Sequence, residues 1–328
     1  MLRKKTFLRI SIVLAIVLAA TGSVFYTRPT WVLAQFQELR LRLDGVQSRQ
    51  VLIDGHRIHY YVRGPVDGTP VVLIHGLGGR SEDWTNLAPY LEHAGYRVYT
   101  PDLLGFGQSE EPTNATYSIA DQADLIVNFF DSVGLRDADL AGWSMGGWIA
   151  QKVAVDHPNR VRRLILMDSA GLMMRPDWDT RLFTPTTPAE LDKLDALLMP
   201  HPPAVPGFVA QDILRLSASY AWVVKRALAS MMTAKDVTDA DLPKLKMPVL
   251  LLWGEQDRIT PLTEGWAMHA LIPQSRLAVA KGCGHTAPQN CSNQFGPEMV
   301  KFLQNEDPMS TGDRLVASKR SGMGQYGF

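Results

Sequence analysis

The chain has 328 residues and a formal net charge of zero, with 33 basic and 33 acidic side chains. A chain of this length can bury a large core, and the lack of a strong charge field argues against nucleic acid as a partner. Its two cysteines are too few to staple a domain of this size, so packing must supply the stability.

The first predicted element is an apolar segment near the N-terminus. Residues 10–26 form an uncharged run of 17 residues, about 25 Å long as a helix, which is just enough to cross a bilayer. Four basic residues precede the run, which predicts a single-pass transmembrane anchor (residues 1–28) with the rest of the chain on the non-cytoplasmic side. The alternative is a signal peptide that is cleaved at the small residues ending the run, which would give a secreted protein.

Residues 29–46 are predicted to form a juxtamembrane amphipathic helix. Trp31 suits a membrane interface. Four apolar side chains recur at helical spacing along one face: Val32, Phe36, Leu39 and Leu43. This face either lies on lipid or packs on the following domain.

From residue 47 onward, short apolar strands alternate with helical segments. Asp54-Gly55 joins the first two strands in a hairpin pattern. Each later strand ends in Gly, Asp or His, which are residues of turns and of active sites. The order predicts an α/β fold with an open, mostly parallel sheet flanked by helices, and a functional site at the carboxyl ends of the strands.

One long segment, residues 172–246, interrupts the alternation because it has no strand pattern. Residues 187–190 match a capping box with proline at the first helical position, so a helix should begin there. We expect a helical cap over the site, inserted between two parts of the core at residues 47–171 and 247–304. The polar, Gly/Ser-rich tail at residues 305–328 predicts disorder.

The strongest chemical motif is G-x-S-x-G at residues 142–146, which follows an apolar strand and precedes a helical segment. In such an elbow the serine sits on a tight turn, where bulky neighbours two residues away would collide. Glycine fits both of those places. The turn would expose the Ser144 hydroxyl, and the backbone N–H of Met145 would point toward the same space.

A serine nucleophile needs a general base, and His285 is the best of the eight histidines. It follows the last core strand and comes last in the order Ser…Asp/Glu…His that this architecture uses. Asp257, at the end of the preceding strand, is predicted to orient the imidazole. Glu255 lies two residues earlier and has the same chemistry, so it remains the alternative acid.

Acyl transfer also needs donors for the negative oxygen of the intermediate. The stretch HGLGG, residues 75–79, ends an early strand in a glycine-rich loop. The backbone N–H of Leu77 is the natural second donor beside that of Met145. His75 is then structural.

These motifs resemble the α/β-hydrolase superfamily over residues 51–303, through the segments HGLGG, DLLGFGQS, GWSMGG, GEQDRITP and GCGHTAPQ. The apolar N-terminus and the stretch TPAELDKLDALLMPHPPAVPGFV look like membrane-anchored monoacylglycerol lipases and phospholipases A1 and related carboxylesterases. Ser144 stands where haloalkane dehalogenases and epoxide hydrolases carry aspartate, which excludes those relatives.

The resemblance implies a serine ester hydrolase that cleaves a small-molecule acyl ester or lipid without a metal or organic cofactor. Ser144 would attack the carbonyl, His285 would carry the proton, and Asp257 would hold the imidazole. Two other classes stay open. One is a carbon–carbon bond hydrolase or cofactor-free perhydrolase with the same triad, and the other is a non-catalytic ligand-binding protein on this fold.

Cys283 and Cys291 flank His285 in the sequence. Outside the cytoplasm they would be able to form a disulfide that braces the histidine loop, whereas two reduced, buried thiols fit the sequence equally well.

Overall fold

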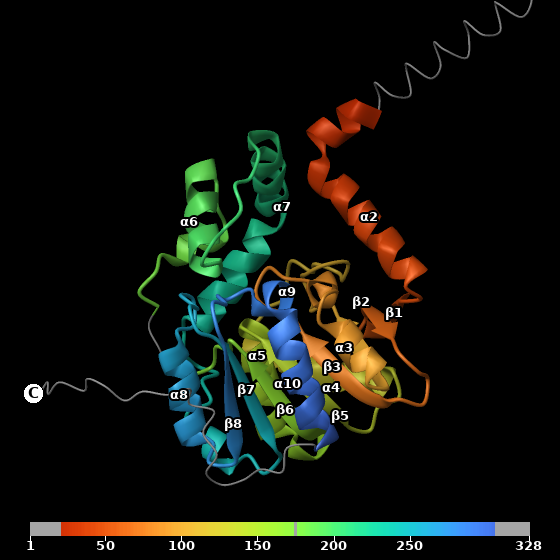
Figure 1. Cartoon of the computed structure of the whole chain (residues 1–328), viewed down its shortest axis with the longest axis vertical. Coiled ribbons are helices and arrows are strands. Elements are labelled where there is room, and N and C mark those ends of the chain that lie inside the picture. The colour runs from red at the N-terminus through yellow and green to blue at the C-terminus, as the bar shows by residue number, and fades with distance from the viewer. Residues whose placement is uncertain (1–20, 174–175, 306–328) are drawn as a thin grey trace, which may run out of the picture.

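The computed structural model describes residues 21–173 and 176–305, in which eight strands form one sheet in the order β1-β2-β4-β3-β5-β6-β7-β8 (Figure 1). The strands β1 and β2 form the predicted hairpin, and β2 is also antiparallel to β4; all other pairs are parallel. The strands are β1 (Gln47–Ile53), β2 (His56–Arg63), β3 (Thr69–Ile74), β4 (Tyr96–Pro101), β5 (Ala138–Trp143), β6 (Val161–Met167), β7 (Val249–Gly254) and β8 (Ser275–Ala280).

Helices cover both faces of the sheet, and the alternation of apolar side chains along each strand makes two cores. In β3, Val71 and Leu73 face one core, whereas Val72 and Ile74 face the other. The first core is closed by α3 (Ala88–His93) and α10 (Ser292–Gln304), and the second by α4 (Ile119–Ser132), α5 (Met145–Asp156) and α8 (Leu262–Leu271). The predicted mostly parallel sheet flanked by helices is therefore confirmed.

Two helices, α6 (Pro188–Leu198) and α7 (Gly207–Met231), lie between β6 and β7 in the sequence and stand above the carboxyl ends of the strands in Figure 1. We call them the cap. Val223 of α7 packs so closely on Gly105 that a Cβ there would lie 2.8 Å from it, which ties the cap to the core. Helix α7 runs unbroken over 25 residues.

The sequence signals for the start of α6 have the expected effect. The hydroxyl of Thr187 accepts the backbone N–H of Glu190, and Pro188 occupies the first turn. The Glu190 carboxylate reaches back one residue further than in a standard capping box, to the backbone N–H of Thr186 at 2.8 Å. Two backbone N–H groups at the start of α6, those of Thr186 and Glu190, thus gain side-chain acceptors.

The predicted anchor, residues 1–28, lies mostly outside the described residues, and residues 21–27 are helical. Within the two described ranges, no helix is long and apolar enough to span a bilayer. Residues 306–328 of the predicted disordered tail also lie outside the described residues.

Helix α2 (Pro29–Leu43) contacts the domain, but not through the predicted apolar face. Leu41 packs with Val46 and Tyr61, and the backbone N–H of Thr30 donates to Asp212 of α7 at 3.0 Å. The interpretation that the predicted apolar face packs on the domain is wrong for most of its length, because Thr30, Gln37 and Leu41 make contacts with the domain instead. Three side chains of that face are 52–79% exposed: Phe36, Leu39 and Leu43.

Cys283 and Cys291 form a disulfide across the loop that carries His285. We therefore expect no free thiols in the unfolded, unreduced protein. Replacing both cysteines with alanine should lower the free energy of unfolding by roughly 2–3 kcal/mol, because the unfolded chain regains the freedom that the disulfide removes. The loss is modest because the closed loop is short. Denaturant titration with and without reductant measures this; a reductant effect that persists in the double variant would contradict the assignment.

The remaining short helices complete the described structure. They are η1 (Ser81–Trp84), η2 (Pro158–Arg160), η3 (Thr180–Phe183), η4 (Leu242–Lys244) and α9 (Ala287–Asn290).

Candidate active site

Ser144 occupies the sharp turn between β5 and α5, with φ 56° and ψ −121°. A Cβ on Gly142 would overlap the carbonyl of Gly146, and a Cβ on Gly146 would overlap the carbonyl of Ile74. The glycines of the motif are therefore required by sterics, as the sequence predicts. The turn is fixed by the backbone N–H of Ser144, which donates to Met167 on β6 at 3.0 Å.

His285 reaches this serine from the loop after β8. Its Nε2 lies 2.9 Å from the Ser144 Oγ, and the ring is only 2% exposed. The indole N–H of Trp143 donates to the His285 carbonyl at 2.7 Å and fixes the loop. The other seven histidines make no hydrogen bond to Ser144 in the described structure. The serine and histidine singled out in the sequence therefore meet.

The structure separates the two candidate acids. Asp257 Oδ2 lies 2.8 Å from His285 Nδ1, while Asp257 Oδ1 accepts the backbone N–H groups of Ile259 and Thr260 at 2.8 and 3.0 Å. Glu255 is exposed and accepts the backbone N–H of Gly282 at 3.1 Å. Only Asp257 is placed to orient the imidazole.

The loop that contains Leu77 lies directly beside the nucleophile. A Cβ on the neighbouring Gly76 would come within 3.2 Å of the Ser144 Cβ. Met145 follows Ser144 as the first residue of α5, where backbone N–H groups lack partners within the helix. The two residues predicted to bind the oxyanion are thus both next to Ser144.

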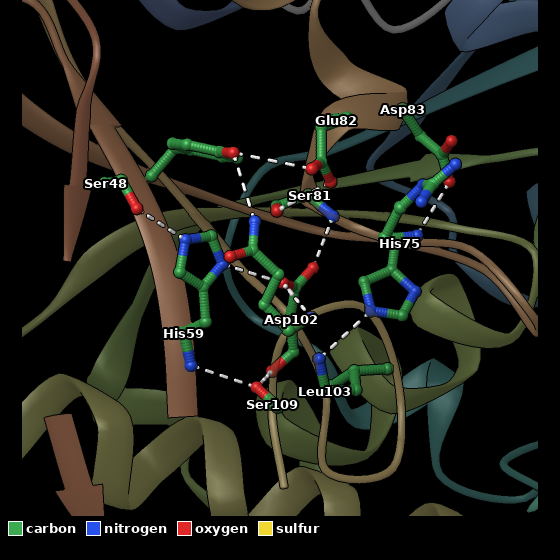
Figure 2. A network of polar contacts seen from close by, with 12 residues as sticks. Ser48, His59, His75, Ser81, Glu82, Asp83, Asp102, Leu103 and Ser109 are labelled. Atoms are coloured by element: carbon green, nitrogen blue, oxygen red, sulfur yellow. Dashed lines mark hydrogen bonds and ion pairs between the residues drawn. The ribbon is translucent and has the colours of Figure 1, made fainter. Parts of the chain in front are cut away.

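A second buried network supports this loop, and Figure 2 shows it. His59 Nδ1 donates to Asp102 Oδ2 at 2.7 Å, and Asp102 Oδ1 accepts the backbone N–H of Ser81 at 2.6 Å. His75 accepts the backbone N–H of Leu103 at 3.0 Å. These bonds tie both ends of the glycine-rich loop to the chain after β4, so His75 has the structural position that the sequence suggests.

Burial alone would raise the pKa of the Asp102 carboxyl, but the hydrogen bond from His59 and those from the backbone N–H groups of Gln108 and Ser81 hold that pKa below its ordinary value. The hydroxyl of Ser48 lies 2.9 Å from His59 Nε2, so this network contains a second Ser–His–Asp chain (Figure 2). Ser48 is on a regular edge strand, away from any elbow. The geometry of an acyl-transfer site is absent there within the described residues.

Two further carboxyl groups lie behind Asp257, those of Asp168 and Glu264, and no motif in the sequence predicted either. Complete burial, and then the charge of Asp257, raise the pKa of Asp168 well above its ordinary value. Burial, and then the charge of Asp257, raise the pKa of Glu264 to about 8. The residue Asp168 ends the β6 segment "LILMD", and this position after a parallel strand was the available signal.

The raised pKa of Glu264 leads to a pH-dependent prediction. Below pH 4.5, a carboxyl whose pKa is higher in the folded state does not lower the free energy of unfolding. Between pH 4.5 and about 8 it lowers that free energy progressively, because the unfolded state loses the proton more readily. Glu264→Gln should therefore raise the free energy of unfolding by up to about 3 kcal/mol at pH 7 and by almost nothing at pH 4. Denaturant titrations at both pH values measure the gain.

The matched control for this prediction is Glu255→Gln, which removes an exposed carboxyl from the loop between β7 and α8, the helix that carries Glu264. It should change stability little at either pH. Equal gains from Glu264→Gln at pH 4 and pH 7 would contradict the assigned titration.

With the geometry defined, comparison with known proteins identifies the family. Residues 69–288 match the profile of the α/β-hydrolase fold family, which is more than half of the chain. The chain belongs to the α/β-hydrolase fold family.

Three similar proteins illustrate its relatives. The chain is 30% identical over 277 residues to 2-hydroxymuconate semialdehyde hydrolase of Pseudomonas putida, covering 80% of this chain and 96% of that protein. It is 29% identical over 252 residues to lipase 1 of Psychrobacter immobilis, covering 71% and 76%. The crystal structure of a membrane phospholipase A, described as a bacterial virulence factor, superposes with a TM-score of 0.78 at 28% identity, covering 90% of this chain and 98% of that one. The fold and these relatives make the chain a hydrolase.

Proposed function

We propose that the protein is a serine hydrolase of carboxylic esters, with lipid-like acyl esters as its substrates. Ser144 attacks the ester carbonyl while His285 takes its proton, and the imidazolium then protonates the leaving alcohol. Asp257 holds the imidazole and stabilises its charge. The backbone N–H groups of Leu77 and Met145 bind the oxyanion, and water releases the acid from Ser144. The observation that carries the proposal is the hydrogen-bonded chain Ser144–His285–Asp257 at an elbow.

Carbon–carbon bond hydrolysis is the second candidate, because a hydrolase of 2-hydroxymuconate semialdehyde is similar over nearly its whole length. An acidic substrate of that kind calls for a cationic side chain in the site. Three arginines between β6 and β7 are instead engaged elsewhere: Arg181 with Asp179, Arg215 with Asp212, and Arg226 with the backbone carbonyl of Ala115. Among solved structures, the phospholipase A also covers more of this chain than a meta-cleavage product hydrolase of Pseudomonas fluorescens does, 90% against 79%. Both observations support the ester substrate.

A substrate panel with the purified full-length protein tests this choice. It should contain p-nitrophenyl esters of increasing chain length, a monoacylglycerol, phospholipid vesicles and a 2-hydroxy-6-oxo-dienoate. We expect turnover of the esters and none of the dienoate beyond the uncatalysed rate. A dienoate rate that exceeds every ester rate would replace the proposal with carbon–carbon bond hydrolysis.

The same proposal places the enzyme at a membrane, held by residues 10–26 with the catalytic domain on the non-cytoplasmic side. The exposed apolar face of α2 then lies on lipid, with Arg40 and Arg42 near the headgroups. Between α2 and η1 lies a groove of about 450 Å³ lined by Leu33 and Phe36 on one side and by Asp83 and Gln289 on the other. Because η1 directly follows the loop of Leu77, a lipid in this groove would contact the segment that leads out of that loop.

Two acidic substitutions on this face test the lipid contact. Phe36→Asp with Leu43→Asp should lower the ratio of the phospholipid-vesicle rate to the soluble-ester rate by about tenfold or more, because roughly 1.5–3 kcal/mol of apolar burial is lost for each side chain. Val66→Asp is the control, since Val66 is 86% exposed and belongs to the loop between β2 and β3 rather than to the apolar face of α2. A ratio that is equal in all three proteins would contradict the lipid contact.

The anchor is tested independently by sedimentation and by N-terminal sequencing of the mature protein. The proposal expects the full chain to sediment with membranes and to resist a high-salt wash. A mature protein that starts near Ser23 would instead be a cleaved, exported hydrolase.

A further inference from the structure

Asp168 is a fully buried acid that the proposed triad does not use. It directly follows β6, and its backbone N–H donates to the Leu252 carbonyl of β7 at 2.9 Å. Its Oδ1 accepts the backbone N–H of Gly254 at 2.7 Å. A φ of 42° puts Asp168 in the left-handed region, which costs about 1–2 kcal/mol for a residue with a Cβ. Packing around the site must therefore hold it there.

The hydrogen bonds around the two acids show which of them carries a proton. Asp257 accepts four donors: two backbone N–H groups, His285 Nδ1–H and the hydroxyl of Thr260 at 2.9 Å. Donors surround it, as befits a carboxylate, and the hydrogen of the Thr260 hydroxyl has a second acceptor nearby, the Asp168 carbonyl. The Oδ2 of Asp168 is buried and has no donor among the described residues. The Thr260 hydroxyl lies between the Asp168 backbone and the Asp257 carboxylate, and Asp257 is the charged side chain that interacts with the Asp168 carboxyl. Two neighbouring carboxyl groups in a dry interior do not both ionise, and the one with fewer donors keeps the proton.

The hydroxyl of Thr260 has more acceptors than hydrogens, so a proton on Asp168 would supply a donor that Asp257 otherwise lacks. This hydroxyl lies 2.9 Å from the Asp168 carbonyl and 2.9 Å from Asp257 Oδ2, yet it has one hydrogen to donate. When that hydrogen is given to the Asp168 carbonyl, Asp257 loses a donor. A protonated Asp168 replaces that donor from behind.

We infer that Asp168 is a positioning residue, a neutral carboxylic acid that donates a hydrogen bond to Asp257 and keeps its carboxylate aimed at His285. This inference rests on the proposed role of the Ser144–His285–Asp257 chain. The donated bond also withdraws charge from Asp257, so that His285 gains its proton less readily than it would beside a bare carboxylate.

The test is a titration of the His285 ring protons by NMR in the full-length protein, compared with Asp168→Asn and Asp168→Ala. Asparagine keeps both bonds, accepting from Gly254 and donating to Asp257, so its midpoint should stay within about 0.3 pH unit of the wild type. Alanine removes the donor, so its midpoint should rise by about 0.5 unit or more. Glu264, the other acid that faces Asp257, has a pKa of about 8 and stays uncharged through most of this window.

Two results would overturn the inference. A midpoint that falls by about 0.5 unit in Asp168→Asn would mean that a negative charge had been removed, so Asp168 was ionised. An unmoved midpoint in Asp168→Ala would leave Asp168 a merely structural role. The NMR titration needs no substrate, so it stays valid if the substrate panel finds no ester turnover. Asp168→Asn by itself decides the charge of Asp168 even if the alanine variant fails to fold.

Activity provides the second arm. Asp168→Ala should lower kcat/KM for esters by about 10–100-fold, the range found at metal sites when the hydrogen-bond partner of a ligand is lost. The kcat/KM of Asp168→Asn should be at least tenfold higher than that of Asp168→Ala at every pH. A rate in Asp168→Asn as low as that in Asp168→Ala would contradict the donated hydrogen bond.

Discussion

Ser144→Ala is expected to lower kcat/KM for esters by a factor on the order of 10⁵, leaving the residual rate that binding and the oxyanion donors supply. The fold should remain intact, because Gly142 and Gly146 make the turn and alanine adds no atom to it. Rates with a short p-nitrophenyl ester measure the loss, and the thermal unfolding midpoint reports the fold. Retention of more than a few per cent of the wild-type rate would rule out Ser144 as the nucleophile.

Ser48→Ala is the matched control for this experiment. Ser48 also bonds a histidine that bonds an aspartate, at distances close to those of the proposed triad (Figure 2). It is exposed on an edge strand, so its removal should leave the ester rate within about twofold of the wild type. A larger loss of kcat/KM in Ser48→Ala than in Ser144→Ala would identify Ser48 as the nucleophile in place of Ser144.

Asp257→Asn should be the second most damaging change, with a loss in kcat/KM of about 10⁴. The backbone N–H groups of Ile259 and Thr260 bind Oδ1, so asparagine will place its carbonyl oxygen there. Its amide –NH₂ then faces His285 Nδ1 and forces the tautomer that cannot take the proton of Ser144. The defect therefore follows from hydrogen-bond donors that the backbone fixes.

Glu255→Gln is the control for the acid and should retain at least half of the wild-type rate, since that side chain faces solvent and, among the residues that the structure describes, accepts a hydrogen bond only from Gly282. A larger loss of kcat/KM in Glu255→Gln than in Asp257→Asn would identify Glu255 as the acid that orients His285. The pair is informative because the two positions are two residues apart and have the same chemistry.

The sequence was most informative where chemistry depends on the local backbone. The turn at Ser144 needs glycine on both sides, and no distant residue changes that requirement. The start of α6 is similarly local, because Thr187, Pro188 and Glu190 are close in the chain. The alternation of strands and helices predicted the parallel sheet, and with it the edge where Ser144 and His285 meet.

Some expectations failed or stayed open because they depended on what a face contacts. The apolar positions of α2 are correct for a helix, but the helix touches the domain through Leu41 and Thr30 and turns Phe36 to the outside. Periodicity shows that a face exists and does not show its partner. The disulfide between Cys283 and Cys291 was equally undecided, since spacing alone does not bring two sulfur atoms together.

By itself, then, the sequence determined the fold class, the elbow, and the order in which Ser144, the acid and His285 follow one another. Only the tertiary structure decided that Asp257 rather than Glu255 faces the histidine, and that Asp168 and Glu264 lie behind it. The physical reason is that a parallel sheet brings together strand ends that are far apart in the chain. At such an edge, burial and neighbouring charge set the protonation of each acid, and neither quantity can be read from the residue type.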